Sequence, residues 1–333
     1  MKEHHYSRET VSLRAELGRT LDRSRLRALH RRSAARHLLV GARQFLLLAV
    51  CGWALVAFEH PLVWVPLAIA QGFTVFNFTV LLHEVVHQNV FGRRRPRAER
   101  LLAWLYAVPS GISASQFTRW HLDHHAELGS EEGDPKRHFL SPTINARWFK
   151  LLYCTPALFP IYFRAARLAA AGYEEELRRS IARERRVAIA AHLSVLAALW
   201  AWGGAAVALR AYVVPVFFVF PVAFTLNRLG QHYDIDPDDP AGWTTLVRGH
   251  RFWNAVFLNS NFHLEHHYFP GVPFYRLPAL QRELTPFYER RGLRWRGYGS
   301  LVRGWLVENR APHTRWGGPA PSLPASQSAG SPR

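Results

Sequence analysis

Four long apolar segments alternate with short polar stretches and set the pattern of hydrophobic and polar positions along the chain. These segments cover residues 38–58, 62–82, 187–209 and 212–229. Each is close to the roughly 20 residues that a helix needs to cross the hydrocarbon core of a bilayer. The pattern therefore predicts four transmembrane helices, with a tight turn at residues 59–61 and a minimal outer turn at residues 210–211.

Two further apolar stretches are too short or too interrupted to cross a membrane. Residues 101–117 contain Pro109, and we expect them to form a re-entrant or interfacial helical hairpin. Residues 149–163 contain Pro156 and Pro160, so we place them at the membrane interface as well.

The two ends of the chain differ from its middle in composition. Residues 1–37 are strongly basic, and three of their leucines recur four residues apart, at Leu13, Leu17 and Leu21. This spacing predicts a solvated or membrane-surface amphipathic helix in a cytoplasmic N-terminal arm. Residues 312–333 are rich in Pro, Ser, Gly and Ala and are expected to be disordered. Residues 38–311 form the predicted membrane domain.

The charge of the chain is explained best by a membrane. The sequence has 42 Lys+Arg against 24 Asp+Glu, a net charge of +18, but it contains no nucleic-acid-binding motif. Basic flanks around apolar segments are typical of cytoplasmic loops, so we expect both termini on the cytoplasmic side. The abundance of arginine and alanine suggests a bacterial genome and hence a bacterial inner membrane. Cys51 and Cys154 lie in apolar stretches and predict buried thiols rather than a disulfide framework.

Histidines recur in four short stretches at spacings that suit metal binding. The nine are His83, His87, His121, His124, His125, His232, His263, His266 and His267. Residues three and four positions apart share one face of a helix, so each stretch can present its imidazoles together. One metal ion takes four to six ligands, so nine histidines suit two ions. His83 and His232 each close an inward-returning segment, which places the whole set at the cytoplasmic face.

Other residues near these stretches are weaker candidates. Three acids within the stretches, Glu84, Asp123 and Glu265, either orient a histidine of another stretch or are ordinary solvated or capping acids. Helical counting back from His83 and His232 selects five residues for an acyl channel: Gly72, Phe76, Thr79, Phe218 and Thr225. Helix packing is the alternative for each. We expect His192 to be a hydrogen-bonded packing residue, and His138 and His250 to lie in loops near the stretches.

The order HxxxH, HxxHH, lone histidine and HxxHH resembles that of the integral-membrane fatty acid desaturase and hydroxylase superfamily. Residues 261–270 (NFHLEHHYFP) are similar to the third histidine box of acyl-lipid desaturases, and residues 271–278 (GVPFYRLP) are similar to the segment directly after that box. The resemblance covers about residues 38–290. It implies a centre of two non-haem iron ions, held by the nine histidines, that uses O2 to attack an unactivated acyl C–H bond. Relatives often have an asparagine four residues before the lone histidine. Here that position is Arg228, and Asn227, which precedes it, is a weaker candidate for a residue that supports the metal ligands.

The fold predicted from these observations is an all-α membrane protein. Four transmembrane helices carry a cytoplasmic helical cap with a histidine-rich di-metal site. The sequence has no GxGxxG, CxxCH or HPGG motif, so electrons must come from an external donor such as a ferredoxin, rubredoxin or cytochrome. A basic surface could steer an acidic donor.

The predicted function is that of an O2-dependent desaturase that introduces a C=C bond into a fatty acyl chain of a lipid. A hydroxylase, ketolase or oxidative decarboxylase on the same scaffold is the close alternative, because the histidines do not fix where the reacting carbon lies. A membrane zinc hydrolase would need only three ligands and an open position, and would leave most of the histidines unexplained. A transporter or metal carrier would place ionisable residues near the bilayer midplane instead.

Overall fold

Helices make up all the regular structure of the part of the chain that the structure describes. The computed structural model describes residues 4–130 and 133–311, and within these ranges the only β-type pairing is one isolated bridge between Val247 and Arg296. The all-α prediction is therefore confirmed for the described residues. The predicted disordered tail, residues 312–333, lies outside them.

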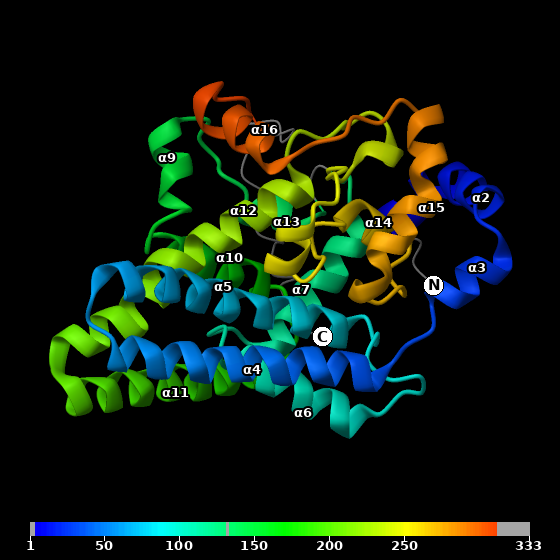
Figure 1. Cartoon of the computed structure of the whole chain (residues 1–333). Coiled ribbons are helices and arrows are strands. Elements are labelled where there is room, and N and C mark those ends of the chain that lie inside the picture. Colours follow the sequence, from blue (N-terminus) through cyan, green and yellow to red (C-terminus); the bar gives the residue numbers. More distant parts are fainter. Residues whose placement is uncertain (1–3, 131–132, 312–333) are drawn as a thin grey trace, which may run out of the picture.

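Three long apolar helices form a layer (Figure 1). They are α4 (Ala34–Ala57), α5 (Pro61–Val86) and α11 (Glu175–Ala208), which continues through η1 (Leu209–Val219) into α12 (Phe220–His232). Three stretches are long and apolar enough to cross a membrane: Arg23–Ala57, Pro61–Val86 and Glu175–His232. The turn between α4 and α5 falls at residues 58–60, close to the position predicted from hydropathy.

The chain reverses within the third long stretch at Gly203 and Gly204. Gly204 has φ +68° and ψ −164°, which only glycine adopts without strain. The outer turn predicted at residues 210–211 is therefore wrong, since η1 is helical there. Arg210 is buried and donates to the backbone oxygens of Leu55 (2.7 Å) and Val56 (3.0 Å), which lie near the C-terminal end of α4. The last carbonyl groups of a helix have no partner within the helix, so they need a donor, and this explains why an arginine is buried against the end of α4.

The remaining helices are short. On the N-terminal side they are α1 (His5–Glu9), α2 (Val11–Thr20), α3 (Arg23–Leu29), α6 (Pro96–Ala107), α7 (Ala114–Glu127), α8 (Pro135–Phe139), α9 (Arg147–Leu152) and α10 (Leu158–Ala170). After α12 come η2 (Pro240–Gly242), α13 (Arg251–Val256), α14 (His263–Tyr268), η3 (Phe274–Arg276), α15 (Leu277–Arg290), α16 (Tyr298–Val302) and η4 (Arg303–Val307). The helices α6 and α7 touch each other and flank a break at residues 108–113, which interrupts the apolar stretch 101–117 where a helical hairpin is expected.

The N-terminal arm packs against the protein itself. Leu13, Leu17 and Leu21 are buried and belong to the same hydrophobic core as residues of α5, α12 and α15. The helices α2 and α15 are in contact, and Arg291 donates to the Glu16 carboxylate across them (3.0 Å from Nε). The membrane-surface alternative is therefore wrong for α2, because its leucine stripe packs in the protein core; its polar face is exposed, as in the solvated alternative.

Candidate metal centre

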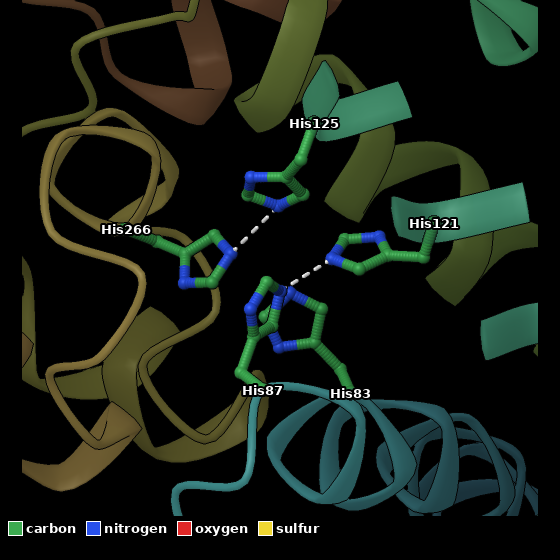
Figure 2. Close-up of side chains that lie close together, drawn as sticks. All are labelled: His83, His87, His121, His125 and His266. Carbon is green, nitrogen blue, oxygen red and sulfur yellow. Dashed lines mark hydrogen bonds between the residues drawn. The ribbon is translucent and has the colours of Figure 1, made fainter. Parts of the chain in front are cut away.

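All nine histidines predicted from the sequence converge in two adjacent groups. One group contains five, His83, His87, His121, His125 and His266, and the other contains four, His124, His232, His263 and His267. Within each group the ligand atoms all lie within 4.8 Å of one another. Figure 2 shows the five-histidine group, whose imidazoles come from the end of α5, from α7 and from α14 and point toward one another.

Helical geometry divides each HxxHH stretch between the two groups. On α7, His121 and His125 are four residues apart and enter the five-histidine group, whereas His124 enters the other. On α14 the outer pair, His263 and His267, enters the four-histidine group and His266 enters the five-histidine group. The members of each i, i+4 pair lie one above the other, and the third imidazole is turned toward the second group. Both groups therefore share two helices.

The imidazole nitrogens face one another at distances that favour a shared cation. His87 Nε2 lies 2.7 Å from His121 Nε2, and His266 Nε2 lies 3.1 Å from His125 Nε2 (Figure 2). In the second group, His232 Nε2 lies 3.0 Å from the Nε2 atoms of both His124 and His263.

His83 supplies a further sign that a cation belongs here. Its Nε2 atom is buried and has no hydrogen-bond partner in the part of the chain that the structure describes. An orphaned buried nitrogen is costly, and a bound cation would satisfy it. Burial also lowers the pKa values of His87, His121, His125 and His266, so these side chains are in the neutral form that binds metals. The residues fit two metal ions, and a purely imidazole set suits iron, copper, zinc or nickel.

Asp134 orients the second group, and sequence reasoning missed it. The Nδ1–H of His124 donates to Asp134 Oδ1 at 2.9 Å, and Asp134 is only 3% exposed. Burial raises the pKa of Asp134, but its interaction with His124, the backbone N–H of Arg137 and the nearby Lys136 together outweigh burial, so the pKa of Asp134 lies below its usual range. Asp134 also caps α8 through the backbone N–H groups of Lys136 and Arg137. The Asp-Pro start of this helix, ten residues after His124, was the signal available in the sequence.

Lys136 is the second residue that the sequence did not reveal. Its Nζ atom lies 2.9 Å from the Nδ1 of His121, on the side of the ring away from the other histidines. Burial is the main cause that lowers the pKa of Lys136 to about 7, and the nearby Arg228 guanidinium adds to it. Only the neutral amine of Lys136 can accept the Nδ1–H of His121 and leave Nε2 of that ring free for a metal, because an ammonium has no lone pair with which to accept.

Two of the weaker candidates do not contact the histidines. The Asp123 carboxylate is paired with Arg119 one turn earlier on α7, at 2.8 Å, so its prediction as a partner of another histidine is wrong. The reason is helical geometry, since Asp123 faces away from the side that carries His121 and His124. Asn227 donates to Ser260 Oγ at 2.7 Å and accepts from Gln231 at 2.7 Å, so it forms no hydrogen bond with His232.

Glu84 and Glu265 are buried but are held by other partners. Glu84 Oε1 lies 3.4 Å from Nδ1 of His83, its own neighbour, and Oε2 accepts from the backbone N–H of Phe274 at 3.0 Å. Glu265 accepts from Gln281 at 2.8 Å and from Tyr288 at 2.9 Å, and burial raises its pKa to about 7. Neither acid contacts a histidine of another stretch, which corrects that prediction. Both instead fix the backbone and side chains behind the centre.

A largely apolar cavity opens beside both histidine groups. His83, His121, His263 and His266 form part of its wall. Seven aromatic residues of α7, α10 and α12 also line it: Phe117, Trp120, Phe159, Tyr162, Phe163, Phe220 and Phe224. Phe76 and Thr79, two of the residues selected for an acyl channel, line this cavity.

The other three residues selected for the channel lie elsewhere. A Cβ atom on Gly72 would come within 2.5 Å of Val219, so this glycine permits close packing of α5 against η1. Phe218 is 51% exposed, because the wider turns of η1 disrupt helical counting back from His232. Thr225 donates to the backbone oxygen of Tyr153 at 2.6 Å. None of the three lines the cavity, which corrects the predicted channel.

Two histidines outside the nine, His192 and His250, have structural contacts. His192 lies between Tyr212 (Nδ1 to Oη, 2.6 Å) and the backbone oxygen of Val108 (Nε2, 2.9 Å), the packing role expected for it. His250 caps α13 through the backbone N–H of Phe252. Neither His138 nor His250 belongs to a histidine group.

Comparisons with known proteins bear on these observations. The family model described as "Fatty acid desaturase" matches residues 59–299. The sphingolipid delta(4)-desaturase/C4-monooxygenase of Homo sapiens is 29% identical over 227 residues, which cover 64% of this chain and 63% of the human protein. The sphingolipid delta(4)-desaturase of Drosophila melanogaster is 27% identical over 225 residues, covering 65% and 64%. The matched part thus spans a little under two thirds of the length of these curated relatives.

Proposed function

This chain belongs to the fatty acid desaturase family, and from that premise we propose that it is an O2-dependent membrane oxidoreductase that desaturates a lipid acyl chain. The observation that carries the proposal is the position of two buried histidine groups beside one apolar cavity. A cavity with aromatic walls suits a hydrocarbon chain and excludes water from it. The names of the relatives, which refer to sphingolipid desaturation, favour the same class of reaction.

The nine histidines would hold two non-haem iron ions, one in each group. When bound, the two irons supply the oxidising chemistry needed to remove hydrogen from an unactivated methylene group, which no side chain can supply. The protein's own residues orient the ligands: Asp134 fixes the ring and tautomer of His124, and Lys136 contacts the outer nitrogen of His121. Phe76 and Thr79 help to shape the cavity in which the chain would lie.

Hydroxylation is the second candidate outcome on the same site. The name of the human relative joins desaturase with C4-monooxygenase, so this kind of scaffold is associated with both products. The two outcomes differ in where the reacting carbon lies relative to the histidine groups. Electrons would come from an external ferredoxin, rubredoxin or cytochrome, and exposed arginines such as Arg93, Arg94 and Arg97 suit an acidic donor.

We further propose four transmembrane crossings with the metal centre on the cytoplasmic side. The helices α4 and α5 would supply two, and the two arms of the stretch Glu175–His232, which reverses at Gly203 and Gly204, would supply the others. The hydrogen bond between His192 and Tyr212 supports antiparallel arms that lie side by side. A membrane-impermeant maleimide should label a cysteine placed at His60 only from outside and one placed at Arg178 only from inside. Labelling of both from one side would contradict four crossings.

Lipid profiling after expression in a host that lacks the product tests the function. A loss of two hydrogens from one lipid class indicates desaturation, and a gain of one oxygen indicates hydroxylation. His263→Ala, which removes a member of the four-histidine group, should abolish the product, whereas His138→Gln, outside both groups, should retain it. The purified protein should contain two irons per chain. A single zinc with turnover that is independent of O2 would overturn the proposal.

A further inference from the structure

A cationic groove lies next to the apolar cavity, on the surface between α10 and α11. Arg164 and Arg167 of α10 and Arg185 of α11 line it. Arg164 and Arg167 are exposed, and neither forms a hydrogen bond or ion pair with another residue in the described ranges 4–130 and 133–311. No acidic residue lines the groove. Three guanidinium groups with no acidic partner among the described residues therefore line one surface hollow.

The nearest acidic side chain on α11 is already engaged. Glu184 precedes Arg185, but its carboxylate oxygens accept from the hydroxyls of Ser113 and Ser115, each at 2.6 Å. These bonds hold Glu184 against the start of α7. Arg185, on α11, donates to the side-chain oxygen of Gln116, which lies on α7. Within the described residues, then, no acidic side chain of α11 is left free to balance the groove, which makes an anion from outside the chain the natural ligand.

The groove and the cavity share part of their walls. Gly111 and Phe163 line both. Gly111 has φ +67° and no side chain to fill the space, and Phe163 is 38% exposed. The Arg185 guanidinium carbon lies 5.9 Å from the centre of the Phe163 ring. A molecule with its charged end in the groove could thus extend an apolar chain past Gly111 and Phe163 into the cavity.

The groove lies at the depth expected for a lipid head group. Arg185 stands where the charged first part of α11 gives way to its apolar part, and Ile189, one turn later in the groove wall, is 58% exposed. An arginine beside exposed apolar side chains is typical of the boundary between hydrocarbon and head groups.

We propose that this groove binds the phosphate of the acyl carrier while the acyl chain occupies the cavity. Guanidinium groups recognise phosphate oxygens through paired, charge-assisted hydrogen bonds. The ligand would be either a phospholipid or a soluble acyl thioester whose carrier bears phosphate. The placement of the acyl chain in the cavity rests on the proposed function, whereas binding of phosphate in the groove does not. Gln116, which Arg185 contacts, precedes His121 by five residues on α7, or about 7.5 Å along the axis. The position of the reacting carbon along the acyl chain would then be fixed by its distance from the phosphate-bearing end.

Binding of two matched fluorescent lipids to the purified holoenzyme in an uncharged detergent tests this proposal. The probes are labelled phosphatidic acid and labelled diacylglycerol with the same acyl chains. Phosphatidic acid should bind at least about tenfold more tightly, and Arg164→Gln/Arg167→Gln should remove that preference. The matched control, Arg178→Gln/Arg183→Gln, removes two exposed charges of the neighbouring helix outside the groove and should keep it.

The binding results either support the phosphate groove or overturn it. Equal affinity for the two probes, or an equal loss in the control variant, overturns the proposal. Displacement of bound phosphatidic acid by a lower concentration of palmitoyl-coenzyme A than of unlabelled phosphatidic acid assigns the groove to a soluble thioester, and the reverse order assigns it to a phospholipid. Binding is measured without turnover, so failure of the proposed desaturation would appear in lipid profiling and leave this result unchanged.

Discussion

Replacing Asp134 by asparagine separates the orienting role of its charge from its role as a helix cap. An asparagine side chain can still accept from His124 Nδ1 and still cap α8, since asparagine is a good N-cap residue. What is lost is the negative charge behind the imidazole. That charge makes His124 a stronger ligand and holds the tautomer with Nε2 free to bind a metal.

The expected loss can be worked out from the position of Asp134. Mutation of a hydrogen-bonded partner behind a metal-binding histidine usually weakens metal affinity by about 10- to 100-fold, or about 1.4–2.7 kcal/mol. At a chelator concentration that leaves the wild-type site about 90% occupied, the variant should be between about a half and a tenth occupied. Iron per chain, measured by mass spectrometry across a chelator titration, gives this value directly.

Asp123→Asn is the matched control for Asp134→Asn. Asp123 belongs to the same histidine stretch as His124, but its carboxylate is paired with Arg119 near the surface. Exposed pairs of this kind contribute about 0–1 kcal/mol, so iron binding should not change. The reasoning fails if Asp134→Asn retains wild-type iron at every chelator concentration, or if Asp123→Asn loses as much.

Three other predictions use positions away from the metal ligands. Phe76→Ala enlarges the cavity and should shift the product profile toward bulkier or longer acyl chains. Gly72→Leu clashes with η1 and should lower the thermal midpoint of the protein without that shift. Product analysis and melting curves distinguish the two variants. Gly204→Ala should destabilise the protein by about 1–3 kcal/mol, because its φ is +68°, and an unchanged melting curve would refute the turn. The hydrogen bond from Arg291 lowers the pKa of Glu16. The stabilisation that this bond gives the folded protein is therefore present above the usual pKa of 4.5 and is lost as the pH falls through the lowered value. Glu16→Gln should flatten this part of the curve of stability against pH, measured by acid denaturation.

The convergence of the histidines could be predicted because the information in their spacing is local. Spacings of three and four residues place imidazoles on one helical face whatever surrounds the helix. The division into two groups could not be predicted, since it depends on how α5, α7, α12 and α14 meet. The Asp-Pro pair marks Asp134 as the start of a helix, but no local pattern connects Asp134 with His124 or Lys136 with His121, so their contacts could not be predicted.

The chain reversal shows a different limit. Hydropathy marks where apolar segments end, and Arg210 interrupts an apolar run, so the sequence predicts a surface turn there. The structure buries Arg210 against the end of α4, where unpaired carbonyls need a donor. The glycine pair at Gly203 and Gly204 was the better signal, because a backbone with positive φ is a stronger constraint than one charged side chain.

The way each HxxHH stretch divides makes the two proposed metal sites interdependent. Both α7 and α14 give two histidines to one group and one to the other, so a shift of either helix moves ligands of both groups. The helix α14 has only six residues and is held by the Glu265 bonds to Gln281 and Tyr288 on α15. Loss of one metal would relax the helices that the other needs. Metal release should therefore be cooperative, and a substitution at a single histidine should reduce the occupancy of both sites.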